Sequence, residues 1–167
     1  MYKKMGKKVI WYLEMINKNE FKPKTLPKDA DVIKIGIPLP IINRFFYKEV
    51  GKLWYWTDRA KWNIDRWNDW VKRENLQTWI LLYKGTPAGY FELETREKEV
   101  EIAFFGLLPE FIQKGLGGGF LSAAIKNAWE IKKTRVCVNT CSLDHRNALN
   151  NYKSRGFKII REENVDF

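Results

Sequence analysis

The chain has 167 residues, 45% of them hydrophobic and 15% aromatic, which excludes a disordered tail and predicts one folded domain with a sizeable core. Its formal net charge of +10 at pH 7 favours either an anionic partner (a nucleic acid, a membrane surface or a phosphorylated cofactor) or simply a solvated, lysine-rich surface. No apolar run is long enough to cross a membrane, and no block of five or more basic residues marks a nucleic-acid-binding segment.

The N-terminal residues and the cysteines indicate a cytoplasmic protein. The apolar stretch near the N-terminus is short, is interrupted by Glu14 and lacks a small-residue cleavage site, so we do not expect a signal peptide. Cys137 and Cys141 are four residues apart in a predicted strand, roughly 13 Å, whereas a disulfide needs Cα atoms within about 7 Å. We therefore expect free thiols and, with a single histidine in the chain, no metal site.

In chain order, the first half begins with a strand and continues with helices. We expect a strand at residues 8–13, a proline-containing loop at 17–31, an extended piece at 31–37, and helices at 40–50 and 58–72. Thr57 is a plausible N-cap for the second helix. That helix is predicted by an apolar stripe at spacings of three and four, made of Trp56, Ala60, Ile64, Trp67 and Val71.

The second half alternates strands and helices. We expect strands at 77–83, 88–94, 99–105, 135–140 and 157–161, and helices at 118–132 and 144–155, with a hairpin between the first two strands. Within 88–94, one face carries Tyr90, Glu92 and Glu94, and the other carries Phe91 and Leu93. This order predicts a single α/β domain with a sheet of mixed direction.

The most specific motif in the sequence is a glycine-rich loop. Gly115, Gly117, Gly118 and Gly119 follow a strand and precede a helix, an order that gathers backbone N–H groups and the positive end of a helix where a diphosphate fits. No Lys-Ser or Lys-Thr follows, as a Walker loop requires, and Ser122 stands where a dinucleotide fingerprint has its third glycine. The remaining alternative is a tight turn and helix cap without a ligand.

A second group of residues lies at 140–157. Asp144 is a fair N-cap for the last helix, Ala148 and Tyr152 share a helical face, and Gly156 is placed to end the helix. Taken alone, Tyr152 is expected to be a core aromatic residue and His145 a surface residue in the first turn.

Together the two segments resemble the GCN5-related N-acetyltransferases (GNAT). In that family a strand–glycine loop–helix unit binds the coenzyme A pyrophosphate, and a later helix ends in A-x-x-x-Y-x-x-x-G-F, which this chain matches at Ala148, Tyr152, Gly156 and Phe157. The resemblance covers residues 77–160. The chain departs from the family at Ile112, where Arg or Gln is usual, at His145, where Asn is frequent, and at its C-terminal end, where we expect the usual seventh strand to be missing or very short.

The resemblance implies an α/β fold of the GNAT-like acyl-CoA N-acyltransferase type, with a mixed, mostly antiparallel sheet flanked by helices and with splayed central strands. Residues 1–167 would form one domain, with the acceptor-side part at about 1–76 and the acetyl-CoA-binding part at about 77–167. The implied reaction moves an acetyl group from acetyl-CoA to a primary amine of a small molecule or a protein. The alternatives are a non-catalytic acyl-CoA-binding module and, less favoured, a basic nucleic-acid-binding protein. The sequence indicates no membrane partner, and it leaves open the acceptor and the oligomeric state, including a homodimer.

The resemblance also implies site residues. Tyr152 would donate a proton to the sulfur and Glu101 would be the base, with Asp144 and His145 as alternative bases. The expected acetyl-CoA contacts are Phe105, Gly106, Leu107, Leu108, Gln113, Lys114, Gly115, Leu116, Gly117, Gly118, Asn147 and Tyr152. For the acceptor, the sequence offers aromatic walls at Trp54, Tyr55 and Trp62 and negative charge at Glu92, Glu94 and Glu101.

Overall fold

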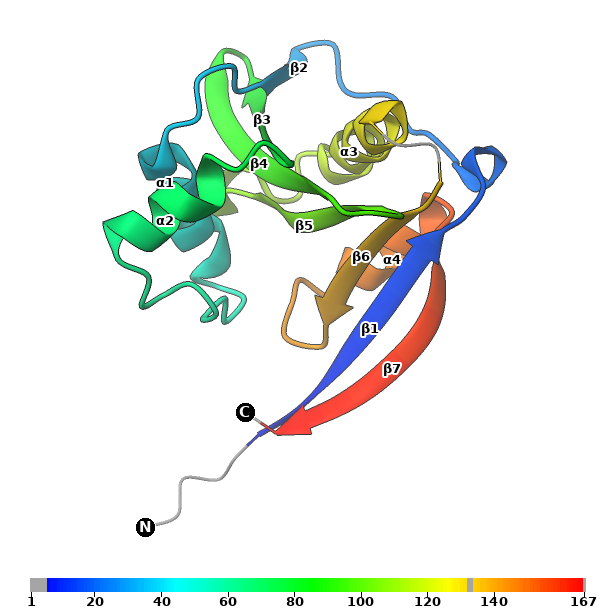
Figure 1. Ribbon diagram of the computed structural model, residues 1–167. Helices are drawn as coiled ribbons and strands as arrows, with labels where there is room; N and C mark the ends of the chain where they lie inside the picture. The colour runs from blue at the N-terminus through cyan, green and yellow to red at the C-terminus, as the bar shows by residue number, and fades with distance from the viewer. Residues whose placement is uncertain (1–5, 132–133, 167) are drawn as a thin grey trace.

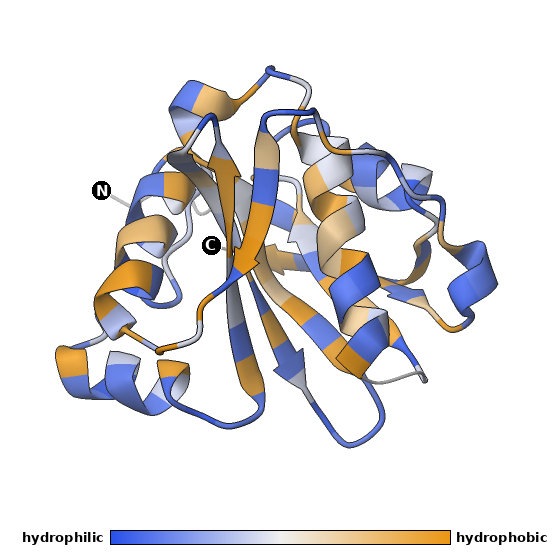
Figure 2. Ribbon diagram, turned by 90° about the horizontal axis from the view of Figure 1, so that it is seen from above, coloured by the Kyte–Doolittle hydropathy of each residue, from blue (hydrophilic) through white to orange (hydrophobic). Residues whose placement is uncertain are grey.

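The computed structural model describes residues 6–131 and 134–166. They form a seven-stranded sheet with helices on both faces (Figures 1 and 2). The strands are β1 (Lys7–Met15), β2 (Ala30–Lys34), β3 (Leu76–Tyr83), β4 (Thr86–Thr95), β5 (Val100–Leu107), β6 (Val136–Cys141) and β7 (Lys158–Asp166). The helices are α1 (Pro40–Gly51), α2 (Ile64–Val71), α3 (Gly117–Ile131) and α4 (Ala148–Ser154), with short 3₁₀ turns η1 (Lys18–Glu20) and η2 (Pro109–Phe111). None of the helices in these two ranges is long and apolar enough to cross a membrane.

The strand order is β2-β3-β4-β5-β6-β1-β7, and every neighbouring pair is antiparallel except β5–β6. The N-terminal strand β1 lies between β6 and β7, where Leu13 faces Val138 on one side and Ile159 on the other. No strand follows β7 in the described part of the chain, yet the sheet reaches seven strands because β1 occupies this position. The predicted mixed, mostly antiparallel sheet is confirmed.

The two sheet faces carry separate cores, as the alternation in β4 predicts. Phe91 and Leu93 belong to the larger core with the apolar stripe of α3. Tyr90, on the opposite face, packs in a smaller aromatic core with residues of α1 and α2, such as Phe46 and Trp67. In Figure 2 the helices flank the sheet on its two sides. The sheet therefore separates an α1–α2 side from an α3–α4 side.

The predicted helix at 58–72 is wrong in its first half, because α2 begins only at Ile64. Asn63, not Thr57, is the N-cap, and its side chain accepts a hydrogen bond from the Arg66 backbone N–H at 2.9 Å. Upstream, the Arg59 backbone N–H donates to the Tyr47 hydroxyl, which holds this segment in turns. The apolar stripe is accordingly interrupted: Trp67 and Val71 are buried, whereas Ile64 is 50% exposed.

The parallel strands β5 and β6 stay paired for only three residue pairs, from Val100–Val136 to Ile102–Val138. At the same point the register of β5 against β4 shifts, so that Ala103 has no partner in β4. A bulge of this kind bends its strand and increases the local twist. The predicted splay of the central strands is therefore present, and it begins after Ile102.

Candidate active site

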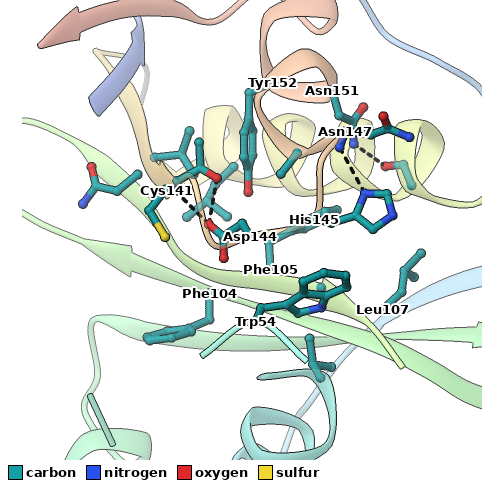
Figure 3. A pocket seen from close by; sticks show the side chains of 18 of the residues that line it. Trp54, Phe104, Phe105, Leu107, Cys141, Asp144, His145, Asn147, Asn151 and Tyr152 are labelled. Carbon is teal, nitrogen blue, oxygen red and sulfur yellow. Dashed lines mark hydrogen bonds between the residues drawn. The ribbon is translucent and has the colours of Figure 1, made fainter. Parts of the chain in front are cut away.

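A cavity of about 780 Å³ opens where β5 and β6 separate. Residues of β5, of the glycine loop, of α4 and of the segment 54–59 line it, and Figure 3 shows part of this lining. The cavity thus joins the two halves of the chain that the sequence assigned to the coenzyme and to the acceptor.

The backbone N–H groups of β5 point alternately toward β4 and toward the gap. Leu108 donates its N–H to Ala88 O at 2.8 Å, on the β4 side. Because backbone groups alternate in direction along an antiparallel pair, those of Phe105 and Leu107 face the opposite side, where β6 has diverged. Both residues line the cavity, as does Gly106 between them. Two backbone N–H groups of β5 therefore point into the gap, where they can donate to a ligand.

The glycine loop ends directly at the cavity. Gln113 and Gly115 have left-handed backbone conformations, with φ of 66° and 74°, and α3 begins at Gly117. The first N–H groups of an α-helix have no partner within the helix, and here they border the cavity at Gly117 and Gly118. Gly119 has a different role, because a Cβ there would lie 2.8 Å from Thr25 O and from Leu26 Cα.

Tyr152 enters the cavity from α4. Its side chain is only 6% exposed and packs edge-on against Phe105 and Phe157, with ring centroids 6.4 and 5.9 Å away. Burial, followed by the nearby Asp144 carboxylate, raises the pKa of Tyr152 well above its ordinary value. In Figure 3 the ring points from α4 toward the side where Asp144 lies. The phenol therefore keeps its proton at neutral pH and can donate it.

Asp144 is not a helix cap, contrary to the sequence prediction, because α4 begins at Ala148. Its Oδ2 accepts hydrogen bonds from Thr140 Oγ1 at 2.8 Å and from the Cys141 N–H at 2.9 Å, and its Oδ1 accepts from Trp56 Nε1 at 3.3 Å. The helix starts late because this carboxylate closes the turn after β6. With both oxygens occupied, Asp144 is an anchor for the turn.

Glu101 lies on β5 at the base of the gap. Its side chain is 13% exposed and forms an ion pair with Arg96, which also binds Glu94. Burial raises the pKa of Glu101, and the opposing effect of Arg96 is smaller. Glu101 lines the cavity and is a carboxylate whose proton affinity is increased, as a general base requires.

Segment 54–59 covers the cavity on the α1–α2 side. Trp54 packs edge-on against the His145 ring, with centroids 5.3 Å apart, and Trp56 donates to Asp144. The His145 Nδ1 accepts the Asn147 N–H at 3.1 Å. One ring contact and one indole hydrogen bond therefore bridge the acceptor side and the β6–α4 turn.

Two acceptor-side expectations need correction. Trp62 does not line the cavity but packs against Trp67 and Trp70. Glu92 is fully buried and bound by Arg59, so it offers no free negative charge. Trp54, Tyr55, Glu94 and Glu101 do line the cavity, as does Trp56, which the sequence assigned to a helical stripe.

The structure brings most of the predicted site residues to one place. The predicted residues that line the cavity are Glu101, Phe105, Gly106, Leu107, Gln113, Gly115, Leu116, Gly117, Gly118, Asn147 and Tyr152; Leu108 and Lys114 lie outside it. Lys24 and Arg155 also line the cavity, and no sequence motif marked them. Both cysteines are free, as predicted. Among the described residues, no group of three or more His, Cys, Asp or Glu side chains is arranged to hold a metal ion.

Comparison with known proteins agrees with this geometry. The sequence profile of the acetyltransferase (GNAT) family matches residues 41–157. A search of curated protein sequences gives no match. A GCN5-related N-acetyltransferase from Sphaerobacter thermophilus superposes with a TM-score of 0.69 at 12% identity, over 95% of this chain and 51% of that chain. One from Kribbella flavida gives a TM-score of 0.68 at 13% identity, over 95% of this chain and 57% of that chain.

A third solved structure is similar over a larger share of its own length. An aminoglycoside acetyltransferase from an uncultured soil metagenomic sample gives a TM-score of 0.63 at 12% identity, over 76% of this chain and 87% of that chain. At these identities the structural likeness establishes the fold, and the profile match establishes the family. The chain spans about half of the first two structures, so their complete architecture is larger than the domain described above.

Proposed function

This chain belongs to the acetyltransferase (GNAT) family, and from that premise we propose that it transfers the acetyl group of acetyl-CoA to a primary amine of a small molecule or a protein. The observation that carries the proposal is the gap between β5 and β6, which has the glycine loop at one end and Tyr152 and Glu101 beside it. The gap can hold an extended thioester-bearing arm, and the free N–H groups at the start of α3 suit its diphosphate.

In the proposed reaction the neutral amine attacks the acetyl carbonyl, the C–N bond forms and the C–S bond breaks. The gap-facing N–H groups of Phe105 and Leu107 stabilise the negative charge that develops on the carbonyl oxygen. Tyr152 gives its proton to the departing thiolate, and Glu101 receives the proton that the amine loses, directly or through water.

The contacts around the alternative bases favour Glu101. Asp144 already accepts three hydrogen bonds. In neutral His145 the Nδ1 lone pair is taken by the Asn147 N–H, which leaves the proton on Nε2 and no free acceptor on the ring. Glu101 has an elevated pKa. It pairs with Glu94 on the sheet face that carries Tyr90 and the α1–α2 core, where we expect the acceptor.

Replacement of Glu101 by glutamine should change the pH dependence of turnover. The carboxylate is active only when ionised, so kcat/KM of the unmodified protein should rise with pH through a pKa above the ordinary glutamate value of about 4.3. In Glu101→Gln this limb should disappear and kcat/KM should fall by about tenfold to a hundredfold. If the rising part of the pH profile shifts when an amine of different pKa is used, it reports deprotonation of the acceptor and not of the enzyme. If the part of the profile that does not depend on the amine is the same in Glu101→Gln, Glu101 is not the base.

The proposed function is tested by binding and turnover together. Coenzyme A at about 100 times its Kd should stabilise the fold by about 2.7 kcal/mol and raise the melting temperature by about 5 °C or more. Acetyl-CoA with a panel of polyamines, aminoglycosides and lysine peptides should then release free thiol only with an acceptor. Coenzyme binding without acetylation of any amine would favour the acyl-CoA-binding module. No binding at millimolar coenzyme A would overturn the proposal.

A further inference from the structure

Two cationic side chains lie against the first turn of α3. A Cβ placed on Gly118 would be 2.7 Å from Lys24 Cδ and 2.7 Å from Arg155 Nη1, so both side chains cross this turn at close range. Both residues line the cavity. They approach from opposite ends of the chain, Lys24 from the loop after β1 and Arg155 from the end of α4. The positive end of α3 is thereby joined by two further positive charges.

Backbone contacts hold the Lys24 segment in this position. The Lys24 N–H donates to Ser122 Oγ at 2.8 Å, and that hydroxyl donates to Gly118 O at 2.9 Å. The next two residues pack on Gly119 so closely that a Cβ there would lie 2.8 Å from Thr25 O. The absence of a side chain at Gly119 therefore brings the loop, and Lys24 with it, onto α3.

Arg155 is held by α4 and its neighbours. Its carbonyl accepts the Lys22 N–H at 2.9 Å, and one turn earlier Asn151 Nδ2 donates to Gly117 O at 3.1 Å. The end of α4, the Lys24 loop and the start of α3 are thus tied together. The two cations are presented by a fixed framework and are not carried on a free loop.

These cations have no anionic partner within the described residues. Neither Lys24 nor Arg155 forms an ion pair there. The Arg155 Nε is buried and lacks a hydrogen-bond acceptor among the same residues. A buried donor without a partner is unfavourable, and buried polar atoms in native proteins are nearly always satisfied. An anion at the start of α3 would satisfy it.

We infer that Lys24 and Arg155 are the side chains that bind the phosphate groups of the coenzyme. The inference rests on the proposed function. Ile112 lines the cavity beside the glycine loop, and its apolar side chain has no hydrogen bond to offer a phosphate group. Arg155, with its planar array of N–H donors, and Lys24, as a point charge, supply the side-chain contacts to the phosphates from two other segments.

The test is calorimetric titration of coenzyme A into the full chain and its variants. Arg155→Gln should raise the Kd about tenfold, as loss of a charge-assisted hydrogen bond implies. Lys24→Gln should raise it about threefold, because this side chain is exposed. The matched controls Lys153→Gln on α4 and Lys28→Gln in the same loop are exposed, lie outside the cavity and should leave the Kd unchanged.

A second measurement separates phosphate binding from a structural role. With S-acetyl-pantetheine, which has no phosphates, the Arg155 and Lys24 variants should acetylate as fast as the unmodified protein, whereas with acetyl-CoA their KM should rise. Comparison of coenzyme A with its 3′-dephospho form assigns each residue to the 3′-phosphate or the diphosphate. If Arg155→Gln does not fold, Arg155→Lys and Lys24→Gln carry the test.

The outcomes separate the two proposals. Equal losses with both acetyl donors, or an unchanged Kd for coenzyme A in both variants, would overturn the phosphate assignment and leave the proposed function intact. If the unmodified protein fails to bind coenzyme A, the proposed function fails, and this inference fails with it.

Discussion

Replacement of Tyr152 by phenylalanine is expected to lower kcat by about 10²- to 10⁴-fold, the range of a lost general acid. Phenylalanine retains the ring contacts with Phe105 and Phe157, so only the hydroxyl is removed. The thiolate must then leave without a proton donor. Steady-state turnover with acetyl-CoA and an accepted amine measures the loss. The Kd of coenzyme A should not change, because the phosphate-binding loop is untouched.

The pH profile and a control variant sharpen this prediction. Because burial and Asp144 raise the pKa of Tyr152, its loss of a proton should not limit activity below about pH 10, the ordinary tyrosine value. Tyr12→Phe is the matched control: Tyr12 also lines the cavity, but its hydroxyl is bound to Glu163 at 2.9 Å. Full activity in Tyr152→Phe, or an equal loss in Tyr12→Phe, would show that Tyr152 is not the acid.

The elements with a strong repeating pattern were predictable from the sequence. The side chains of a strand alternate between its two faces, and this period predicted which residues of β4 share a face. Phe91 and Leu93 are in one core and Tyr90 is in the other, as expected. The glycine loop followed by an apolar helical stripe identified α3, and the four-residue spacing of Ala148 and Tyr152 put the tyrosine on the inner face of α4. These signals are local, because each depends on neighbours within two turns of helix or a few strand residues.

Features that depend on distant partners were not predictable. Charged residues are mostly exposed, so nothing near Arg59 in the sequence indicated that it would be buried and that the helix predicted at 58–72 would begin only after it, at Ile64. Its partner Glu92 is 33 residues away. Lys24 and Gly118 meet only because the loop after β1 packs on α3. The position of β1 between β6 and β7 likewise depends on pairing across most of the chain.

The buried Arg59–Glu92 pair is expected to be the most sensitive point for stability. Arg59 Nη1 lies 3.0 Å from both Glu92 oxygens, and the two side chains are 3% and 0% exposed. Glu92 also accepts hydrogen bonds from Asn43 Nδ2 and Trp70 Nε1, each at 2.9 Å. The Arg59 guanidinium lies 4.1 Å from the ring centroids of Trp70 and Phe104, which adds cation–π contacts.

Arg59→Met should therefore lower the free energy of unfolding by about 3–5 kcal/mol, since it leaves a carboxylate buried without its counter-charge. Urea unfolding measures this change. The double variant Arg59→Met/Glu92→Gln should lose less than the sum of the single variants, because glutamine can still accept from Asn43 and Trp70 without carrying a charge. The control Lys52→Met breaks a more exposed ion pair with Glu49 on the same side and should leave the urea midpoint unchanged.

The same pair connects stability to acceptor binding. Arg59 follows Trp54 and Trp56 in the segment that covers the cavity. Its backbone N–H donates a hydrogen bond to the Tyr47 hydroxyl. Without the guanidinium this segment loses its main buried attachment to β4. In Arg59→Met, below the temperature at which it unfolds, the KM for the amine should rise while the Kd of coenzyme A stays the same. If Arg59→Met also loses affinity for coenzyme A, the pair supports the whole sheet and not this segment alone. If the urea midpoint of Arg59→Met is unchanged, the aromatic packing alone holds the segment.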